Sequence, residues 1–426
     1  MLTQNRIITE SANVNPQQNA LEVANRIRVG VMIHDNPRSL DAGWAFLVNE
    51  APIRVRGLYD LKNDVLWISS GRFDDFKQRG SAQMHHVRRT DYLGIKLDEL
   101  AADLGIRIDG QNACEGGAQI VSFVEQAVKS AIVMYGLSDP LRQLQDDSMI
   151  ASIKKMLPQA LAPKAMMATQ LAAAYQSFSA CYQPFMDNTV SITLRFDRFP
   201  YAKWLLDKKV PDNSWSLIPD STGFKHDDVM DEKFTPTLIN GVLEMDNVSA
   251  NMASLIAFGC GVSPAKKMMR RWMTDVEYRW ISRFARVHVT EYFVAKSGVN
   301  LPELYKLPEQ LVGDPLLTRT VSSGIIASMH WHALVAQTYV ARSKKNEYDP
   351  IATWIRAHDR AKCFEAAKEL SDRKFHVTGY GNGAVYVKVD KERFIDLSET
   401  ALELGFAYPR WNALLQEFGY ASAHPN

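Results

Sequence analysis

The pattern of apolar and polar positions divides the chain into a strand-rich beginning, a helical middle and a mixed end. Near the beginning, short runs of β-branched and aromatic residues are separated by Asn, Asp, Pro and Gly, which is the pattern of strands joined by turns. Four such runs lie at 27–33, 44–48, 52–61 and 64–69. They predict a small N-terminal sheet in which Lys62-Asn63-Asp64 forms a hairpin turn.

Further along, the apolar period lengthens to 3.6 residues, which is typical of amphipathic helices. The clearest helix is predicted over 118–137, with others over 96–106, 141–157, 163–182, 358–371 and 396–418, and with the most helical region over 248–345. A strand is predicted over 189–196 and a hairpin over 374–389, turning at Gly381-Asn382-Gly383. We therefore expect an α+β fold that is predominantly α-helical, with a small N-terminal sheet, a large helical centre and a C-terminal α/β subdomain with a β-hairpin.

Changes in composition along the chain indicate its domain boundaries. The first residues are polar and lack an apolar period, so we expect an N-terminal arm. The segment 207–246 carries nine acidic and four basic residues, whereas 250–345 carries thirteen basic and six acidic residues. The predicted units are an N-terminal arm over 1–25, a small α/β subdomain over 26–110, a helical subdomain over 111–206, an acidic loop or linker over 207–247, a basic helical subdomain over 248–345 and a C-terminal α/β subdomain over 346–426.

Composition narrows the class of protein. A chain of 426 residues with 46% apolar and 23% charged residues is typical of a globular protein, and its net charge of +1 argues against coating nucleic acid through bulk positive charge alone. The four cysteines lack metal-ligand spacing and are predicted to be reduced thiols. The start of the chain lacks a secretory signal, and no apolar run reaches the ~20 residues of a membrane span. We expect a cytoplasmic or virion protein that does not enter a membrane.

The stretch 266–288 (KKMMRRWMTDVEYRWISRFARVH) combines seven cationic side chains with four aromatic rings. Wound as one helix, it places its large apolar residues on one face and three arginines in a stripe along the edge of that face. Arginine binds phosphate through paired hydrogen bonds, so this region is a candidate nucleic-acid contact. The predicted site comprises Lys266, Lys267, Arg270, Arg271, Arg279, Arg283 and Arg286. The alternative is that Asp275, Glu277 and acids of the 207–246 segment neutralise the stripe inside the protein.

Other motifs give no candidate catalytic residue. His330-Trp331-His332 lies in a predicted helix, where side chains two residues apart point in different directions, so we expect no metal site there. The acidic run 226–232 (HDDVMDE) lacks the glycine and the spacing of a calcium loop. The motifs GxxxxGK[ST], GxGxxG and GxSxG do not occur. The motifs therefore predict no catalytic residue, no metal ligand and no cofactor, although residues distant in sequence can still form a site in space.

Two segments about 190 residues apart resemble motifs of a known family. The segments 192–204 (ITLRFDRFPYAKW) and 379–390 (GYGNGAVYVKVD) are similar to the A and C motifs in the palm domain of family B DNA polymerases. The resemblance implies carboxylates that hold two metal ions for phosphoryl transfer. Asp197 is too close to the following Phe-Pro pair for the family spacing, and the turn positions of the carboxylates carry Asn382 and Ala384. We interpret the similarity as a chance resemblance of a strand-helix unit and a hairpin.

The leading hypothesis from the sequence is a self-assembling structural protein of a virus or mobile element. It would be a capsid protein or a nucleoprotein that encloses or coats nucleic acid without reading its sequence. The expected partners are further copies of the chain, forming a homo-oligomer, and nucleic acid, RNA more than DNA, held through phosphate contacts. One alternative is a metal-dependent enzyme acting on nucleic acid or nucleotides, with Asp197, Asp227 and Asp228 near the metal. Another is an adaptor protein that binds an acidic partner.

Overall fold

The computed structural model of the chain describes residues 16–36, 42–71, 87–89, 97–137, 189–260, 268–299, 338–340, 345–347 and 350–407, with short gaps inside 97–137 and 189–260, together with 170, 171 and 174. The helices predicted over 141–157 and 163–182 fall wholly or almost wholly outside these residues, as does His330-Trp331-His332. No helix in the described part of the chain is both long and apolar enough to cross a membrane.

A five-stranded sheet forms the N-terminal part of the fold. Its strands are β1 (Arg28–His34), β2 (Gly43–Leu47), β3 (Ile53–Val55), β4 (Val65–Ser69) and β5 (Val87–Arg89), in the order β3-β2-β1-β4-β5. β2 is antiparallel to β1 and β3, whereas β4 is parallel to β1 and β5. The predicted N-terminal sheet is present. The predicted hairpin at Lys62-Asn63-Asp64 is wrong, because β3 and β4 do not pair and β1 and β2 lie between them.

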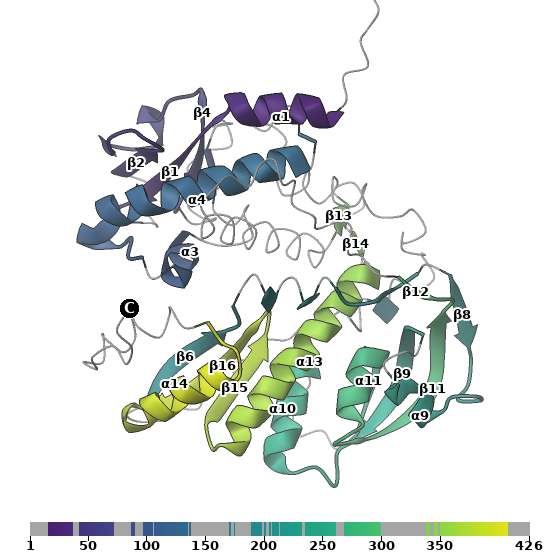
Figure 1. The fold of residues 1–426 in the computed structure, drawn as a ribbon. Helices are drawn as coiled ribbons and strands as arrows, with labels where there is room; N and C mark the ends of the chain where they lie inside the picture. Colours follow the sequence, from purple (N-terminus) through teal and green to yellow (C-terminus); the bar gives the residue numbers. More distant parts are fainter. Residues whose placement is uncertain are drawn as a thin grey trace, which may run out of the picture.

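Helices cover this sheet. They are α1 (Pro16–Arg26), α3 (Leu97–Asp103) and α4 (Ala113–Met134), with short 3-10 turns η1 (Leu58–Asp60) and η4 (Gly110–Asn112). The long α4, predicted from its periodicity, packs on β1 and β2, and α1 lies against it (Figure 1). Gly117 allows this close approach, since a Cβ there would lie 2.2 Å from the ring of Phe46. Ala20 and Ala24 of α1 are buried, so that part of the predicted arm belongs to the folded core.

Two antiparallel sheets dominate the second half of the chain. One has the order β10-β9-β11-β8 and consists of β8 (Trp215–Ile218), β9 (Thr237–Glu244), β10 (Met268–Thr274) and β11 (Arg286–Ala295). The other has the order β15-β16-β6 and consists of β6 (Thr189–Arg195), β15 (His376–Gly381) and β16 (Ala384–Asp390). Two small pairs join β7 (Val210–Pro211) to β12 (Gly298–Val299) and β13 (Thr338–Val340) to β14 (Lys345–Glu347). The strand predicted over 189–196 and the C-terminal hairpin are confirmed.

The helices of this half are α9 (His226–Met230), α10 (Ala250–Cys260), α11 (Asp275–Ile281), α13 (Pro350–Asp372) and α14 (Phe394–Glu403), with the 3-10 turn η9 (Lys391–Arg393). α13 is central, because it contacts α10, α11, β15 and β16 (Figure 1). The helix predicted over 358–371 is confirmed and begins eight residues earlier. The last predicted helix begins at Phe394 and ends at Glu403, and positions 408–418 of that prediction lie outside the described residues.

Strand β11 contains a β-bulge next to its centre. Val289 is opposite Gly241 and Glu291 is opposite Asn240, so Thr290 is an extra residue with no counterpart in β9. The Thr290 hydroxyl donates to the backbone oxygen of Asn240 at 3.1 Å, and the Asn240 amide donates to the Glu291 carboxylate at 2.7 Å. The polar groups around the bulge are therefore hydrogen-bonded.

The apolar core continues from the N-terminal sheet into the second half of the chain. One cluster of buried side chains contains Phe46 of β2, Val124 of α4, Val276 of α11 and Trp354 of α13. A second cluster contains side chains from both antiparallel sheets and from α10, α11, α13 and α14. The described parts of the chain thus pack on shared cores.

The prediction of a predominantly helical fold is wrong, and the described residues form a mixed α+β fold. The region 248–345, predicted as the most helical, contains the long strands β10 and β11 beside α10 and α11, and the acidic segment 207–247 contains β7, β8 and β9. Apolar residues in 266–288 match a helical period, but pairing with β9 on both sides places β10 and β11 in a sheet. The predicted domain boundaries stay a prediction.

Candidate functional site

The turn between β15 and β16 holds a carboxylate from inside the protein. Asn382 and Gly383 both have positive φ angles, 55° and 69°, so their backbone N–H groups point toward the same side. Both amides donate to Asp359 of α13, Asn382 to Oδ2 and Gly383 to Oδ1, each at 2.7 Å. Asp359 is only 2% exposed. The turn and α13 are therefore joined by two charge-assisted hydrogen bonds.

Two further side chains surround the Asp359 carboxylate. The hydroxyl of Tyr201 donates to Oδ1 at 2.6 Å, and the thiol of Cys363 lies 3.6 Å from the same oxygen. Burial, followed by the charge of Asp359, raises the pKa of Tyr201 and that of Cys363 well above their ordinary values. Both groups therefore keep their protons and serve as donors rather than as a nucleophile or a base.

Strand β6 ends at Arg195 beside this turn, two residues before Asp197. The backbone amide of Phe196 donates to the backbone oxygen of Gly383 at 3.0 Å, which places the exposed Asp197 next to the turn. Ala384, at the other position where the polymerase motif has a carboxylate, is fully buried. Within the described ranges, no three His, Cys, Asp or Glu side chains gather closely enough to hold a metal ion. Asp227 and Asp228, the other acids proposed for a metal, lie exposed on α9.

A cavity of about 800 Å³ opens between α11, α13 and the segment that follows β6. Its lining is rich in charged side chains. The cations are Lys208, Lys209, Arg279, Arg283 and Lys362, and the acids are Asp207, Asp231, Asp275 and Glu365. The rings of Trp204, Trp280 and Trp354 and the imidazole of His358 complete the polar and aromatic parts of the wall. The size is that of a cavity for a small ligand or for part of a larger one.

One of the four acids is neutralised within the protein. Asp275 accepts hydrogen bonds from the backbone amide of Thr237 at 3.1 Å and from Trp354 Nε1 at 2.9 Å, and it pairs with Arg279 at 3.0 Å. Burial raises the pKa of Asp275, and the adjacent charge of Arg279 opposes that shift. The pair Asp275–Arg279 therefore forms part of the wall and contributes little net charge to the space beside it.

His358 is a partly buried imidazole in the wall of the cavity. Burial, followed by the positive charges of Lys208 and Arg279, lowers the pKa of His358 from 6.5 to about 3. The imidazole is therefore neutral at physiological pH. Lys208 Nζ lies 4.1 Å from the ring centroid of Trp204, which fixes one cation in a cation–π contact at the rim.

The described residues of the predicted basic site lie on β10, on α11, in the turn after α11 and on β11 instead of on one helix. Lys266 and Lys267 lie outside the described residues, and the side chain of Arg270 on β10 is also outside them. Arg271 pairs with Glu277 at 3.0 Å, and Arg286, on β11, lies 3.7 Å from Glu244. Arg279 and Arg283 both line the cavity, and Arg283 is exposed. The single stripe of Arg279, Arg283 and Arg286 expected for a helix over 266–288 is therefore wrong.

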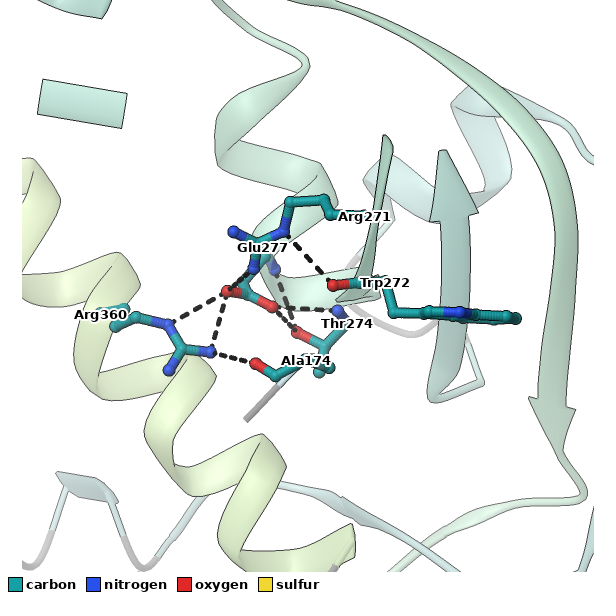
Figure 2. Close-up of polar contacts among 6 residues, drawn as sticks. All are labelled: Ala174, Arg271, Trp272, Thr274, Glu277 and Arg360. Atoms are coloured by element: carbon teal, nitrogen blue, oxygen red, sulfur yellow. Dashed lines mark hydrogen bonds and ion pairs between the residues drawn. The ribbon is translucent and has the colours of Figure 1, made fainter. Parts of the chain in front are cut away.

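Figure 2 shows the buried cluster that organises this region. The Glu277 carboxylate forms ion pairs with Arg271 at 3.0 Å and with Arg360 of α13 at 2.8 Å. Arg360 also donates a hydrogen bond to the backbone oxygen of Ala174 at 3.0 Å. Glu277 and Thr274 form a capping box that begins α11, with hydrogen bonds of 3.1 and 3.2 Å. The cluster fixes α11 against α13 and so shapes one wall of the cavity.

Some of these residues carried a sequence signal and others did not. Thr274-Asp275-Val276-Glu277 matches the T-x-x-E pattern of a helix start, which would have separated β10 from α11. In contrast, Lys208, His358 and Lys362 meet at the cavity from segments about 150 residues apart, and no spacing rule connects them. Asp359 was missed for the same reason.

Comparison with known proteins finds similarity at the level of structure only. No protein-family model and no curated protein matches the sequence. Among solved structures, phi29 DNA polymerase bound to single-stranded DNA matches with a TM-score of 0.48 and 8% identity, over 85% of this chain and 80% of the polymerase. Its ternary complex with primer-template DNA and incoming nucleotide gives a TM-score of 0.40 at 9% identity, with the same coverage. The family B DNA polymerase of the archaeon Pyrobaculum calidifontis gives 0.25 at 10% identity, over 88% of this chain and 55% of that one.

These comparisons correct the leading hypothesis from the sequence. The matching solved structures named above are DNA polymerases, so the assignment as a capsid protein or nucleoprotein of a virus or mobile element is wrong, and the expected preference for RNA over DNA has no support.

Proposed function

We propose that this protein binds nucleic acid through the cavity between α11, α13 and the segment 204–209. The observation that carries the proposal is the convergence of five cationic side chains on one cavity from three separate parts of the chain. Lysine and arginine bind phosphate groups without reading base sequence. The cavity thus supplies contacts to a strand backbone, which is the first requirement of a protein that acts on nucleic acid.

The five cations of the cavity exceed its four acids by one, so the lining carries a net charge of +1. Arg279 is matched by Asp275, whereas Lys209 and Arg283 are exposed at the opening and Lys362 lies about one helical turn beyond His358. Burial, which is the larger cause, and the charges of Lys208 and Arg279 together keep His358 neutral, so the imidazole adds no positive charge to the cavity.

Charge reversal at the cavity tests the proposal. We expect Arg283→Glu combined with Lys362→Glu to weaken the binding of a fluorescent single-stranded oligonucleotide at least tenfold. The slope of log affinity against log salt concentration should become less steep by about 1.4, because each phosphate contact in a single strand contributes about 0.7 to that slope. Fluorescence anisotropy over a salt series, with DNA and RNA oligonucleotides of equal length, measures both quantities.

A matched control uses two exposed cations of the N-terminal sheet region. Arg56→Glu combined with Lys62→Glu makes the same change in net charge away from the cavity, and we expect it to leave the affinity within about twofold. Equal losses in the two double variants would contradict the proposed site, and no binding by the unaltered protein would contradict the function. Homo-oligomerisation stays a prediction of the sequence, and light scattering in the same buffers measures it.

A further inference from the structure

The β15–β16 turn lies where the resemblance to polymerase motifs implies carboxylates that hold metal ions. Such a site needs oxygen ligands that converge from the end of β6 and from the turn. At these positions the structure has the carboxylate of Asp197, the side-chain amide of Asn382 and the buried methyl group of Ala384. One carboxylate and one neutral amide do not match the ligand set of two divalent cations.

Asp359 does not supply the missing ligand. Its Oδ1 accepts from Gly383 N and from the Tyr201 hydroxyl, and its Oδ2 accepts from Asn382 N. These three donors surround a side chain that is 2% exposed and belongs to α13, beneath the turn. Successive backbone N–H groups in such a turn often bind an anion from solution. Here the Asp359 side chain occupies that position.

We infer that the β15–β16 turn is a platform held by an internal carboxylate, and that nucleic-acid binding at the adjoining cavity is independent of divalent cations at this turn. The part of the inference about nucleic-acid binding rests on the proposed function. The part about the turn can be tested on the protein without any ligand. It makes the turn a rigid support held by α13, the helix that also lines the cavity, and not a ligand set for two divalent cations.

Hydrogen exchange tests the state of the turn without any ligand. In the unaltered protein we expect the amides of Asn382 and Gly383 to exchange at least tenfold more slowly than the amide of the exposed Asn63, measured by NMR or by mass spectrometry with fragmentation. In Asp359→Asn, protection of these two amides should fall at least tenfold while Val387 in β16 stays protected. Rapid exchange of both amides in the unaltered protein would overturn the inference even if the variant does not fold.

Metal dependence tests the second half of the inference. We expect the oligonucleotide affinity to agree within twofold between buffers with excess Mg²⁺ and with EDTA at equal ionic strength. Electron paramagnetic resonance with Mn²⁺ alone should show equal binding to the unaltered protein and to Asp197→Asn. Tight Mn²⁺ binding that disappears in Asp197→Asn, or a tenfold gain in affinity with Mg²⁺, would overturn the inference. Failure to bind oligonucleotide in both buffers would instead contradict the proposed function. The exchange and Mn²⁺ measurements need no oligonucleotide, so they would still test the inference about the turn.

Discussion

Glu277 shows how much of this site depends on one buried side chain. Its carboxylate is fully buried and is shared by two arginines, Arg271 from β10 and Arg360 from α13, while its backbone and second oxygen complete the start of α11. A buried charge of this kind is tolerated only when its partners are in place. Arg271, one of the residues that the sequence predicted to bind nucleic acid, is therefore part of this internal ion pair.

Glu277→Gln should destabilise the protein strongly. The substitution keeps the shape of the side chain but leaves Arg271 and Arg360 without their counter-charge, so we expect the free energy of unfolding to fall by roughly 3–5 kcal/mol. Chemical denaturation followed by circular dichroism measures the change. Glu369→Gln, which removes the exposed pair with Arg373, should cost roughly 0–1 kcal/mol. Similar losses in the two variants would contradict the role given to burial.

His358 should make stability depend on pH. Its pKa is about 3 in the folded protein and near 6.5 when unfolded, so the unfolded state binds more protons between these values and stability rises with pH in that window. This contribution is fully present above about pH 6.5 and is lost as the pH falls toward 3. Relative to His358→Gln, the unaltered protein should lose about 1–2 kcal/mol between pH 7.5 and pH 5. Identical pH profiles in denaturation experiments would contradict this expectation.

At the scale of elements, the sequence predicted a helix or strand correctly where the apolar residues follow one clear period. It failed where the same residues fit both a helix and a strand. The helix α4, the hairpin β15–β16 and most of the N-terminal strands follow their patterns, because their side chains meet one face of a core. The stretch 266–288 has apolar residues that fit both a helix and paired strands, and the partner strand β9, which decides between them, lies elsewhere in the sequence. The cavity depends on such distant pairings, so it could not be predicted from local patterns.

The β15–β16 turn has a measurable conformational preference. Asn382 has a positive φ of 55° and an exposed side chain, so substitution changes backbone strain while leaving packing intact. Asn382→Gly should be neutral or slightly stabilising, whereas Asn382→Ala should lower the free energy of unfolding by roughly 1 kcal/mol. Glu399→Ala, at an exposed position in α14, controls for the introduction of alanine. Denaturant titrations of the three variants measure the differences, and equal stability of the Gly and Ala variants would argue against the positive φ.

For the whole molecule, the shared core predicts cooperative unfolding. Val124 of α4 and Trp354 of α13 belong to one buried cluster, although they are 230 residues apart in sequence. Neither the sequence pattern nor the charge distribution indicates this connection, because both describe each segment separately. The core therefore links the N-terminal sheet to the helix that carries Asp359 and His358.

Val124→Ala should loosen α13 as well as α4. The smaller side chain leaves a cavity in the cluster, which costs roughly 1–3 kcal/mol. Hydrogen exchange at increasing denaturant concentration should show that peptides of α4 and of α13 lose protection together, at a lower concentration than in the unaltered protein. Loss of protection in α4 alone would show that the two halves unfold independently.

The β-bulge at Thr290 bears on how the length of this chain can vary. Deletion of Thr290 would remove the extra residue and leave Val289 and Glu291 opposite their present partners in β9. A deletion at a regularly paired position such as Tyr292 would instead shift the residues beyond it and turn their side chains to the opposite face. We therefore expect related sequences to gain or lose a residue at this point of β11 while keeping the sheet on both sides unchanged.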